Sequence, residues 1–347
     1  MPPTPTAPEP RRAEAPLLRV DDLRVSFPLD EGTVRAVDGV SFEVPPGQVV
    51  GVVGESGCGK SVTIRAILRL VGKPGRVDGG RIMYRRADGS VIDLAALPPR
   101  GPAMRTMRGA EIALIPQEPM AAFSPVHTVG AQIIEAIRLH DPSVSVSAAR
   151  SIVVGLFRDV GISMPERRVD AYSWQLSGGL RQRAMIAMAL SCRPRLLIAD
   201  EPTTAIDVTT QAQILALLRE LQRRHHTSII FITHDLGVIA RMASHVVVMY
   251  LGRVVEQGPV DAIFHSPRHP YTRALLRSIP SLAGATRTKL PVIAGALPHP
   301  FNRPSGCAFH PRCPDAMTRC DQAVPALTAQ GTGQHVACFL YGEAAVS

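Results

Sequence analysis

A phosphate-binding sequence follows directly after a strongly apolar run near the start of the chain. The run Val49 to Val53 is apolar except for one glycine, and residues 54–61 read Gly-Glu-Ser-Gly-Cys-Gly-Lys-Ser. In such a GxxxxGKS loop, glycines let backbone N–H groups turn inward around phosphates, the lysine reaches the terminal phosphates and the serine hydroxyl binds Mg²⁺. A helix beginning near Lys60 adds the positive end of its dipole. The pattern predicts a strand, a nucleotide-binding loop and a helix; a chance match in a surface loop is the alternative.

Composition and charge restrict the class of protein. The 347 residues are 46% hydrophobic and 19% charged, which is typical of soluble globular proteins of one or two domains. No apolar run approaches the roughly 18 residues that span a bilayer. The opening residues are rich in proline and lack the apolar segment of a signal peptide, so we expect a disordered tail and a cytoplasmic protein. The net charge is +9, but the arginines are scattered, which favours a basic surface over nucleic-acid binding; contact with anionic lipid stays open.

The order of apolar patterns divides the chain into four parts. Residues 17–53 alternate β-type runs with Gly and Pro turns, which indicates an antiparallel sheet leading into the phosphate loop. Residues from about 125 to 176 have helical spacing and indicate a helical insertion. From Leu196 onward strands and helices alternate, which predicts a largely parallel sheet. Residues 266–347 are rich in proline, hold four of the six cysteines and show one convincing helix, so we expect an appendage without a core of its own.

Two adjacent carboxylates follow the apolar run at 196–199. In a doubly wound sheet, ligands bind at the carboxyl ends of the strands, which is also where a phosphate loop lies. We therefore expect Asp200 to hold Mg²⁺, directly or through water, and Glu201 to polarise an attacking water as general base. On these two residues alone, capping of the next helix is the alternative.

A third motif, Leu-Ser-Gly-Gly-Leu at 176–180, lies between the helical region and the acid pair. Two glycines at a helix start leave N–H groups open to an anion, and Ser177 adds a hydroxyl donor. In isolation Ser-Gly-Gly is a common flexible turn. Its position after the phosphate loop and before the acid pair is the specific signal.

With these motifs in this order, the chain resembles the nucleotide-binding subunits of ATP-binding-cassette (ABC) transporters over about residues 17–265. The resemblance implies an α/β P-loop NTPase fold, with a RecA-like core, an antiparallel β subdomain and a helical insertion. It implies a disordered tail at 1–15, an ABC ATPase domain at 16–265 with its helical subdomain at about 125–176, and a cysteine-containing C-terminal extension at 266–347.

The same resemblance implies roles for individual residues. In the family an aromatic stacks on adenine, the signature closes on the γ-phosphate held by the other subunit, and a glutamine contacts Mg²⁺ and water and faces the membrane subunits. The implied ATP-binding residues are Phe27, Gly54, Glu55, Ser56, Gly57, Cys58, Gly59, Lys60, Ser61, Val62, Ser177, Gly178, Gly179 and Asp207. The implied catalytic residues are Lys60, Gln117, Glu201 and His234, and the implied Mg²⁺ ligands are Ser61, Gln117 and Asp200. A core aromatic is the alternative for Phe27, and a surface histidine for His234.

Four cysteines lie in the proline-rich C-terminal segment, at Cys307, Cys313, Cys320 and Cys338. A segment that cannot fold by burial alone suggests a metal staple; disulfides are the alternative, but a cytoplasmic protein keeps its thiols reduced. Four thiols suit either Zn²⁺ or an iron–sulfur cluster. The spacings of five, six and seventeen intervening residues lack the CxxC pairs usual in structural zinc sites.

The sequence Val-Val-Glu-Gln-Gly-Pro at 254–259, then His-Pro-Tyr-Thr at 269–272 and the cysteine segment, is similar to the oligopeptide and dipeptide importer branch of this family. That likeness implies a [4Fe–4S] cluster, with Zn²⁺ as the alternative, and an ATPase that powers peptide import at the cytoplasmic face of the cell membrane. It implies two transmembrane permease subunits, an extracytoplasmic substrate-binding protein and a second, related ABC ATPase, and no nucleic acid. A nickel or other small-solute importer is the closest alternative. A soluble ABC ATPase acting on nucleic acid or ribosomes, and an iron–sulfur sensor without enzymatic activity, are the others.

Overall fold

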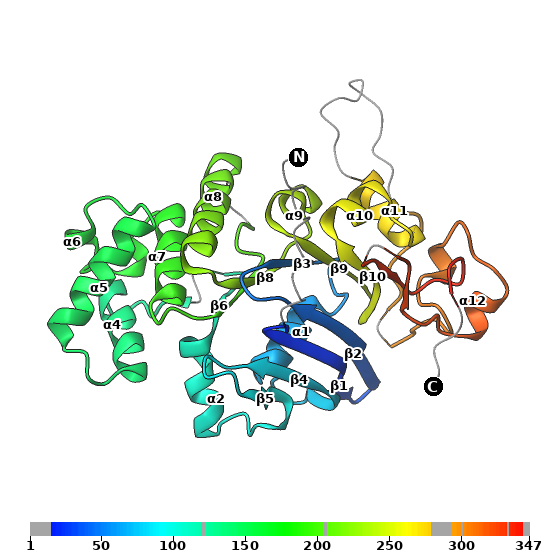
Figure 1. Cartoon of the computed structure of the whole chain (residues 1–347), viewed down its shortest axis with the longest axis horizontal. Coiled ribbons are helices and arrows are strands. Elements are labelled where there is room, and N and C mark those ends of the chain that lie inside the picture. The colour runs from blue at the N-terminus through cyan, green and yellow to red at the C-terminus, as the bar shows by residue number, and fades with distance from the viewer. Residues whose placement is uncertain are drawn as a thin grey trace, which may run out of the picture.

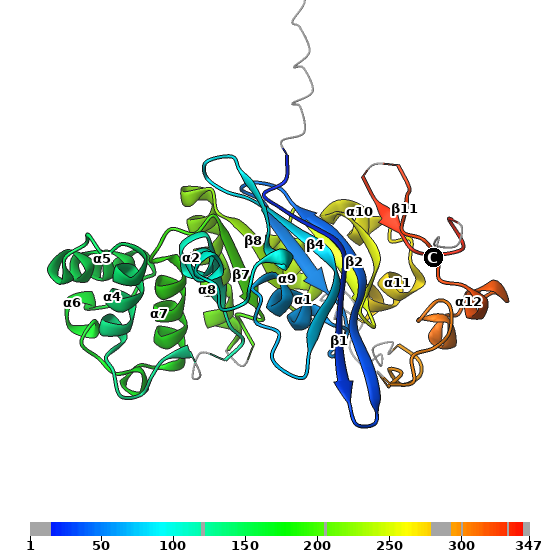
Figure 2. The same ribbon diagram turned by 90° about the horizontal axis from the view of Figure 1, so that it is seen from below.

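The computed structural model describes residues 15–118, 122–204, 207–278, 293–299, 301–331 and 333–342. The predicted disordered tail lies outside the described residues, except for Ala15. Figures 1 and 2 show two sheets in the middle of the molecule, a group of helices at one end and the C-terminal segment at the other. Among the helices of the described ranges, none combines the length and the apolar character that crossing a bilayer requires.

The first sheet is antiparallel, as the sequence predicts. Its strand order is β2-β1-β4-β5, and β1 pairs with β2 on one side and β4 on the other. Buried and exposed residues largely alternate along β1, because one face covers a core and the other faces solvent. The strands are β1 (Leu18–Leu29), β2 (Gly32–Val44), β4 (Arg76–Arg85) and β5 (Val91–Asp93).

The second sheet carries the phosphate loop and has the order β11-β12-β10-β9-β3-β8-β7-β6. From β9 to β6 the neighbouring strands are parallel, which confirms the predicted parallel sheet. Side chains of β3 point alternately into two different cores. Val49 and Val53 belong to one core, and Val50 and Val52 belong to the other, so the whole run is apolar. The strands are β3 (Val49–Val53), β6 (Ile112–Ile115), β7 (Leu196–Asp200), β8 (Ser228–Ile232), β9 (His245–Tyr250), β10 (Arg253–Pro259), β11 (Thr328–Ala329) and β12 (His335–Val336).

Most of the longer helices begin at a polar residue whose side chain accepts a backbone N–H. Thr128, Ser145, Ser177, Asp207 and Asp235 cap α4, α5, α7, α8 and α9 in this way. Between β6 and α7, α4 to α6 form the group of helices at one end of Figure 1. The helices are α1 (Lys60–Ile67), α2 (Pro102–Thr106), α4 (Val129–His140), α5 (Val146–Asp159), α6 (Pro165–Arg168), α7 (Gly178–Leu190), α8 (Val208–His225), α9 (Leu236–Met242), α10 (Val260–His265), α11 (Pro270–Arg277) and α12 (Arg319–Gln322). Short turns of 3₁₀ or related type are η1 (Leu94–Ala96), η2 (Met107–Glu111), η3 (Ser173–Gln175) and η4 (His310–Arg312).

The C-terminal segment, which we define as the described residues from 266 to 342, packs onto the second sheet. Its strand β12 pairs with β10, so the segment extends the sheet that holds the phosphate loop. Tyr271 and Phe309 join the core of that sheet and are almost completely buried. The sequence predicts α11 but neither short strand, because strands of two residues leave no periodic pattern.

Candidate active site

Four neighbouring parallel strands end at one edge of the second sheet, and each is followed by a predicted site residue. Lys60 comes after β3, His234 after β8, Glu201 after β7 and Gln117 after β6. Since these strands lie in the order β3-β8-β7-β6, residues far apart in the sequence meet at one place. This is the edge at which parallel sheets bind ligands.

The phosphate loop requires glycine at defined positions. Gly54, Gly57 and Gly59 have φ of 149°, 79° and 99°. A Cβ at Gly59 would lie 2.3 Å from the carbonyl oxygen of Ala36, and one at Gly54 would lie 2.2 Å from that of Met249. The loop therefore passes against the backbone of β2 and β9 at distances that admit no side chain.

The lysine and serine that end the motif are placed as a phosphate site needs. Lys60 is buried, and its Nζ donates to the carbonyl oxygens of Gly54 at 2.8 Å and Glu55 at 3.0 Å. Ser56 and Gly57 are exposed at the tip of the loop, where a ligand can approach their backbone. Cys58 is fully buried, and burial raises the pKa of its thiol. Val62 packs against the core from the half-buried face of α1.

Asp200 lies beside the serine of the phosphate loop. The Ser61 hydroxyl donates to Asp200 Oδ1 at 3.2 Å, although the two residues belong to different strand-loop units. Burial raises the pKa of Asp200; the hydrogen bond from Ser61 opposes this shift, and the charge of Glu201 adds to it. A hydroxyl and a carboxylate oxygen at this distance are the hard donors that Mg²⁺ takes in phosphate sites.

Three of the four predicted catalytic residues, Gln117, Glu201 and His234, meet at the Glu201 carboxylate. Its Oε2 accepts from Gln117 Nε2 at 3.3 Å and from the Thr204 hydroxyl at 2.9 Å, and lies 3.4 Å from His234 Nδ1. Its backbone has φ of 47°, a left-handed conformation that costs about 1–2 kcal/mol outside glycine. Strain of this kind persists where surrounding contacts hold it, and here those contacts bring Gln117 and His234 to one carboxylate oxygen.

The signature residues lie apart from this cluster. Ser177 caps α7 and accepts from the Leu180 N–H, and both Ser177 and Gly178 are exposed. Figures 1 and 2 both place α7 well away from α1. Gly179 faces Thr210 on α8.

Two further predicted residues lie at the margins of the site. Asp207 caps α8, accepting from the Thr210 N–H at 2.9 Å and its hydroxyl at 2.7 Å, and these bonds lower the pKa of Asp207. Phe27 lies near the end of β1, half-buried, with its ring against Gly75 and against the core. These contacts are those of the core alternative, and stacking on adenine stays a prediction.

The four C-terminal cysteines are free thiols in one part of the segment. The N–H of Cys307 donates to the carbonyl oxygen of Cys320 at 2.7 Å. Burial raises the pKa of Cys338, and the charges of Cys307 and Cys320 add to the shift; burial also raises the pKa of Cys313, to about 11. Yet in the described parts of the chain no group of three or more His, Cys, Asp or Glu side chains is arranged to hold a metal ion. The structure therefore does not support the predicted [4Fe–4S] cluster or the alternative Zn²⁺.

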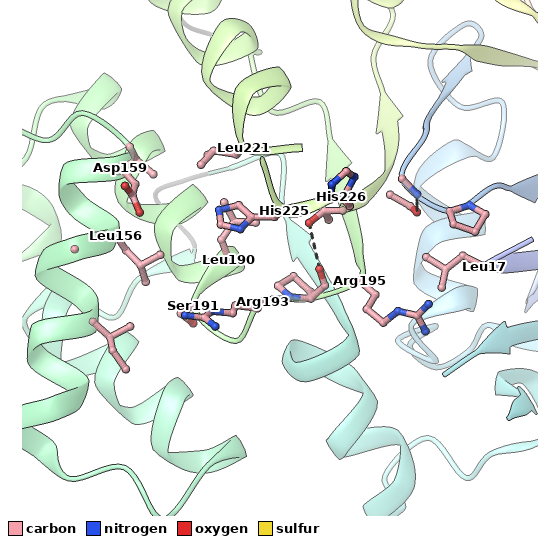
Figure 3. Close-up of a pocket in the computed structure, with 18 residues that line it drawn as sticks. Leu17, Leu156, Asp159, Leu190, Ser191, Arg193, Arg195, Leu221, His225 and His226 are labelled. Atoms are coloured by element: carbon pink, nitrogen blue, oxygen red, sulfur yellow. Dashed lines mark hydrogen bonds between the residues drawn. The ribbon is translucent and has the colours of Figure 1, made fainter. Parts of the chain in front are cut away.

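A separate cavity of about 720 Å³ lies between α5, the end of α7, α8 and the loop before β8 (Figure 3). Leu156, Asp159, Leu190 and His225 are among its lining residues. None of the predicted site residues, all of which lie in the described part of the chain, lines this cavity.

Three residues that contact the site were not predicted from the sequence. Thr204 donates to Glu201, Tyr271 accepts from the Glu55 N–H, and Arg312 forms an ion pair with the Glu55 carboxylate. Thr204 could have been proposed from the sequence, because it lies three positions after Glu201. For Tyr271 and Arg312 the partner lies more than two hundred positions away and no local pattern indicates it.

Comparison with known proteins agrees with this geometry. Residues 37–204 match the ABC transporter family, and residues 255–320 match the family "Oligopeptide/dipeptide transporter, C-terminal region". The chain is 47% identical over 322 residues to the dipeptide transport ATP-binding protein DppD of Escherichia coli, covering 93% of this chain and 96% of that protein. It is 48% identical over 336 residues to a putative peptide import ATP-binding protein of Brucella ovis, covering 95% of this chain and 98% of that one.

Solved structures show the same fold. A dimeric bacterial ABC transporter cassette, MJ0796, superposes with a TM-score of 0.61 at 23% identity, covering 70% of this chain and 98% of that chain. The cassette cbiO1 from Clostridium perfringens, part of the transporter complex cbiONQ, gives a TM-score of 0.59 at 26% identity, covering 73% and 92%. The predicted α/β cassette fold is thereby confirmed.

Proposed function

The chain belongs to the ATP-binding proteins of ABC transporters and is an ATPase of that family, and from this premise we propose that it powers the import of dipeptides or oligopeptides. The observation that carries the substrate class is the near full-length similarity to a dipeptide transport protein, together with the peptide-transporter C-terminal region at residues 255–320. A nickel or other small-solute importer has the same cassette motifs and is the closest alternative. A soluble ABC ATPase acting on nucleic acid or ribosomes is less favoured, because the similarity extends through this C-terminal region.

We propose that ATP binds with its phosphates on the loop from Gly54 to Ser61, where Lys60 supplies positive charge. Mg²⁺ fits the pair formed by the Ser61 hydroxyl and the Asp200 carboxylate, with Gln117 as a further ligand, and when bound it neutralises charge on the phosphates. Glu201 is placed to orient the attacking water as general base, and His234 and Gln117 hold its carboxylate in position. Catalysis then rests mostly on positioning and charge stabilisation.

We propose that hydrolysis requires a second cassette. The support is that Ser177 and Gly178 are exposed and that α7, which begins within this signature, lies apart from α1 in both views (Figures 1 and 2). A second ATPase, related rather than identical, would present its signature to the ATP held at Lys60. Asp207, exposed at the start of α8, is then expected at the interface between the two.

We propose that two permease subunits dock beside Gln117, which places this subunit at the cytoplasmic face of the membrane. A groove of about 330 Å³ lies next to β6, and its lining is mostly apolar. Among the residues that line it are Leu114, Ala122, Ala136, Met185 and Met188. An apolar segment of a permease fits such a groove, and an extracytoplasmic binding protein would deliver the peptide to the permeases.

For the C-terminal cysteines we retain the [4Fe–4S] cluster as a proposal, with Zn²⁺ as the alternative. It is supported by four free thiols in the C-terminal segment, of which Cys307 and Cys320 are joined by a backbone hydrogen bond of 2.7 Å. Thiolates are the ligands that such clusters take. The test is to measure iron and acid-labile sulfide in anaerobically purified protein. Protein that contains neither would contradict the proposed cluster.

The transport proposal is tested by peptide uptake into membrane vesicles that contain this chain, its partner ATPase, the two permeases and the binding protein. ATP on the side of the ATPase subunits should drive uptake of a labelled dipeptide, and Glu201→Gln should abolish it. Nickel uptake measured in the same vesicles tests the alternative. ATP-driven uptake of nickel without uptake of any peptide would overturn the proposed substrate class and leave the ATPase intact.

A further inference from the structure

Glu55, the second residue of the phosphate loop, has its N–H, its carbonyl oxygen and its carboxylate all hydrogen-bonded. Its N–H donates to the Tyr271 hydroxyl at 2.8 Å, and its carbonyl oxygen accepts from Lys60 Nζ at 3.0 Å. Its carboxylate accepts from both terminal nitrogens of Arg312, at 2.7 and 3.1 Å. Two of these three partners belong to the C-terminal segment, which is therefore in direct contact with the loop.

Tyr271 reaches the loop because its helix is fixed at its first residue. His269 is buried and caps α11, its Nδ1 accepting from the Tyr271 N–H at 3.0 Å, and Pro270 occupies the first helical position. The ring of Tyr271 is fully buried between Tyr250 and Phe309, at centroid distances of 4.7 and 5.3 Å. A side chain held in this way has one orientation, and in that orientation its hydroxyl meets the phosphate loop.

Arg312 is unusual among the charged side chains of this segment. Only 4% of its side chain is exposed, and its guanidinium forms a two-pronged pair with Glu55 and donates to the Tyr250 hydroxyl at 3.3 Å. Arg312 belongs to the turn η4. Two backbone hydrogen bonds hold this turn, from the His310 N–H to the Cys307 carbonyl oxygen and from the Cys313 N–H to the His310 carbonyl oxygen. A two-pronged pair with a buried guanidinium fixes geometry far better than an exposed single contact does.

Simple attachment of the segment does not require this contact. The segment is already joined to the cassette by the pairing of β12 with β10 and by Arg303, which donates to Asp38 Oδ2 at 2.7 Å. Those attachments lie outside the stretch from Gly54 to Ser61. Tyr271 and Arg312 instead converge on one residue inside that stretch, from two different elements of the segment.

We propose that Tyr271 and Arg312 are positioning residues of the ATP site. They hold Glu55, and through it the start of the loop, in the conformation that turns the backbone N–H groups toward the phosphates. The proposal rests on the ATP site described above. Its consequence is that the affinity of the cassette for ATP depends on a segment outside the cassette, and by linkage ATP binding stabilises the docked segment in return.

The test uses the full-length chain and two conservative variants, each with a matched control. Tyr271→Phe removes one hydroxyl and keeps the buried ring, and Arg312→Lys keeps the charge and loses the two-pronged geometry. The controls are Tyr341→Phe and Arg273→Lys, because Arg273 and Tyr341 bond to each other within the same segment, at 2.5 Å, and not to the loop. The dissociation constant for MgATP is measured with a fluorescent ATP analogue, and kcat and KM in the assembled transporter.

Tyr271→Phe should weaken MgATP binding by about 5-fold and Arg312→Lys by about 10-fold, the sizes expected for one lost hydrogen bond and one loosened charged pair. KM should rise to match, with kcat and the melting temperature close to those of the controls. Glu55→Gln should weaken MgATP binding as much as Arg312→Lys does. The double variant Glu55→Gln/Arg312→Lys should bind MgATP no more weakly than either single variant, because both changes remove the same ion pair.

Binding by Tyr271→Phe and Arg312→Lys that equals binding by the controls would overturn the proposal and leave the ATP site intact. An equal loss in all four variants would also overturn it, since it would show only that the segment must fold. A fall in kcat with KM unchanged contradicts a positioning role in ATP binding. Failure of the unaltered chain to bind MgATP would remove the ATP site itself, and this proposal with it.

Discussion

The motifs of the cassette and the contacts of the C-terminal segment differ in how far apart along the chain their bonded residues lie. Within single motifs the bonds are local: Lys60 donates to a carbonyl oxygen six residues earlier, and Asp207 accepts from a residue three positions later. In the C-terminal segment, Arg312 and Arg303 find their partners 257 and 265 positions away. A bond between residues close in the sequence forms wherever that short sequence occurs. A bond between distant residues forms only when the whole fold brings them together.

The largest effect is expected where the loop leaves no space. Gly59→Ala places a Cβ 2.3 Å from the Ala36 carbonyl oxygen at φ of 99°, so strain and overpacking together should weaken MgATP binding by about 4 kcal/mol. Gly57→Ala is the matched control, because it has φ of 79° but nothing within 4 Å of the added atom, and it should lose only about 1–2 kcal/mol. Equal losses in the two variants, measured by nucleotide titration, would show that the close approach at Gly59 is not what defines the loop.

A smaller effect is expected where the segment meets the cassette. Asp38 is buried and accepts from Arg253 and Arg303 at 2.7 Å each, so Asp38→Asn leaves two guanidinium groups without their anion. The free energy of unfolding should fall by about 3 kcal/mol, measured by urea denaturation. Asp22→Asn is the control, since Asp22 is exposed and forms an ion pair with Arg24 on the surface, and it should change stability by less than about 0.5 kcal/mol. Similar losses in both variants would mean that the buried pair does not anchor the segment.

The buried His269 of the C-terminal segment should make the stability of the protein depend on pH. Burial, with the charge of Arg273 second, lowers the pKa of His269 to about 3. Between pH values of about 3 and 6.5, His269 is protonated in the unfolded chain but neutral in the folded chain. The free energy of unfolding therefore falls as the pH falls, by about 1.4 kcal/mol per pH unit. Acidification from pH 7 to pH 5 should therefore cost about 2 kcal/mol. His269→Asn, which keeps a capping acceptor, should lose this dependence in urea unfolding, and an unchanged dependence would assign it to other groups.

The smallest effect is expected at a local contact of the cassette. Asp207→Ala removes the cap of α8 and its bonds to Thr210, which should destabilise the chain by about 1 kcal/mol. Asp207→Asn keeps an acceptor at the same position and should stay close to the unaltered chain. Thermal unfolding of both variants checks this, and a loss as large as that for Asp38→Asn would break the contrast between local and distant bonds.

The same contrast explains what the sequence could predict. The phosphate loop, the acid pair and the parallel sheet are contiguous strings or periodic runs, and the rule that ligands bind at strand ends brings Lys60, Glu201 and His234 together. Arg312 could not be predicted, because a buried arginine in a proline-rich stretch carries no sign of the carboxylate that it meets. The cysteines predicted a metal site from number alone, and in the described residues their placement does not form one.

Glu201→Gln in the assembled transporter tests the central claim most directly, because that carboxylate is where Gln117, Thr204 and His234 converge. Steady-state ATP hydrolysis and retention of labelled MgATP are measured on the same sample. Hydrolysis should fall by about 100- to 10,000-fold, the usual contribution of a general base, while MgATP stays bound at Lys60. Hydrolysis at the unaltered rate would contradict the account, since the site would then cleave ATP without the residue on which its geometry centres.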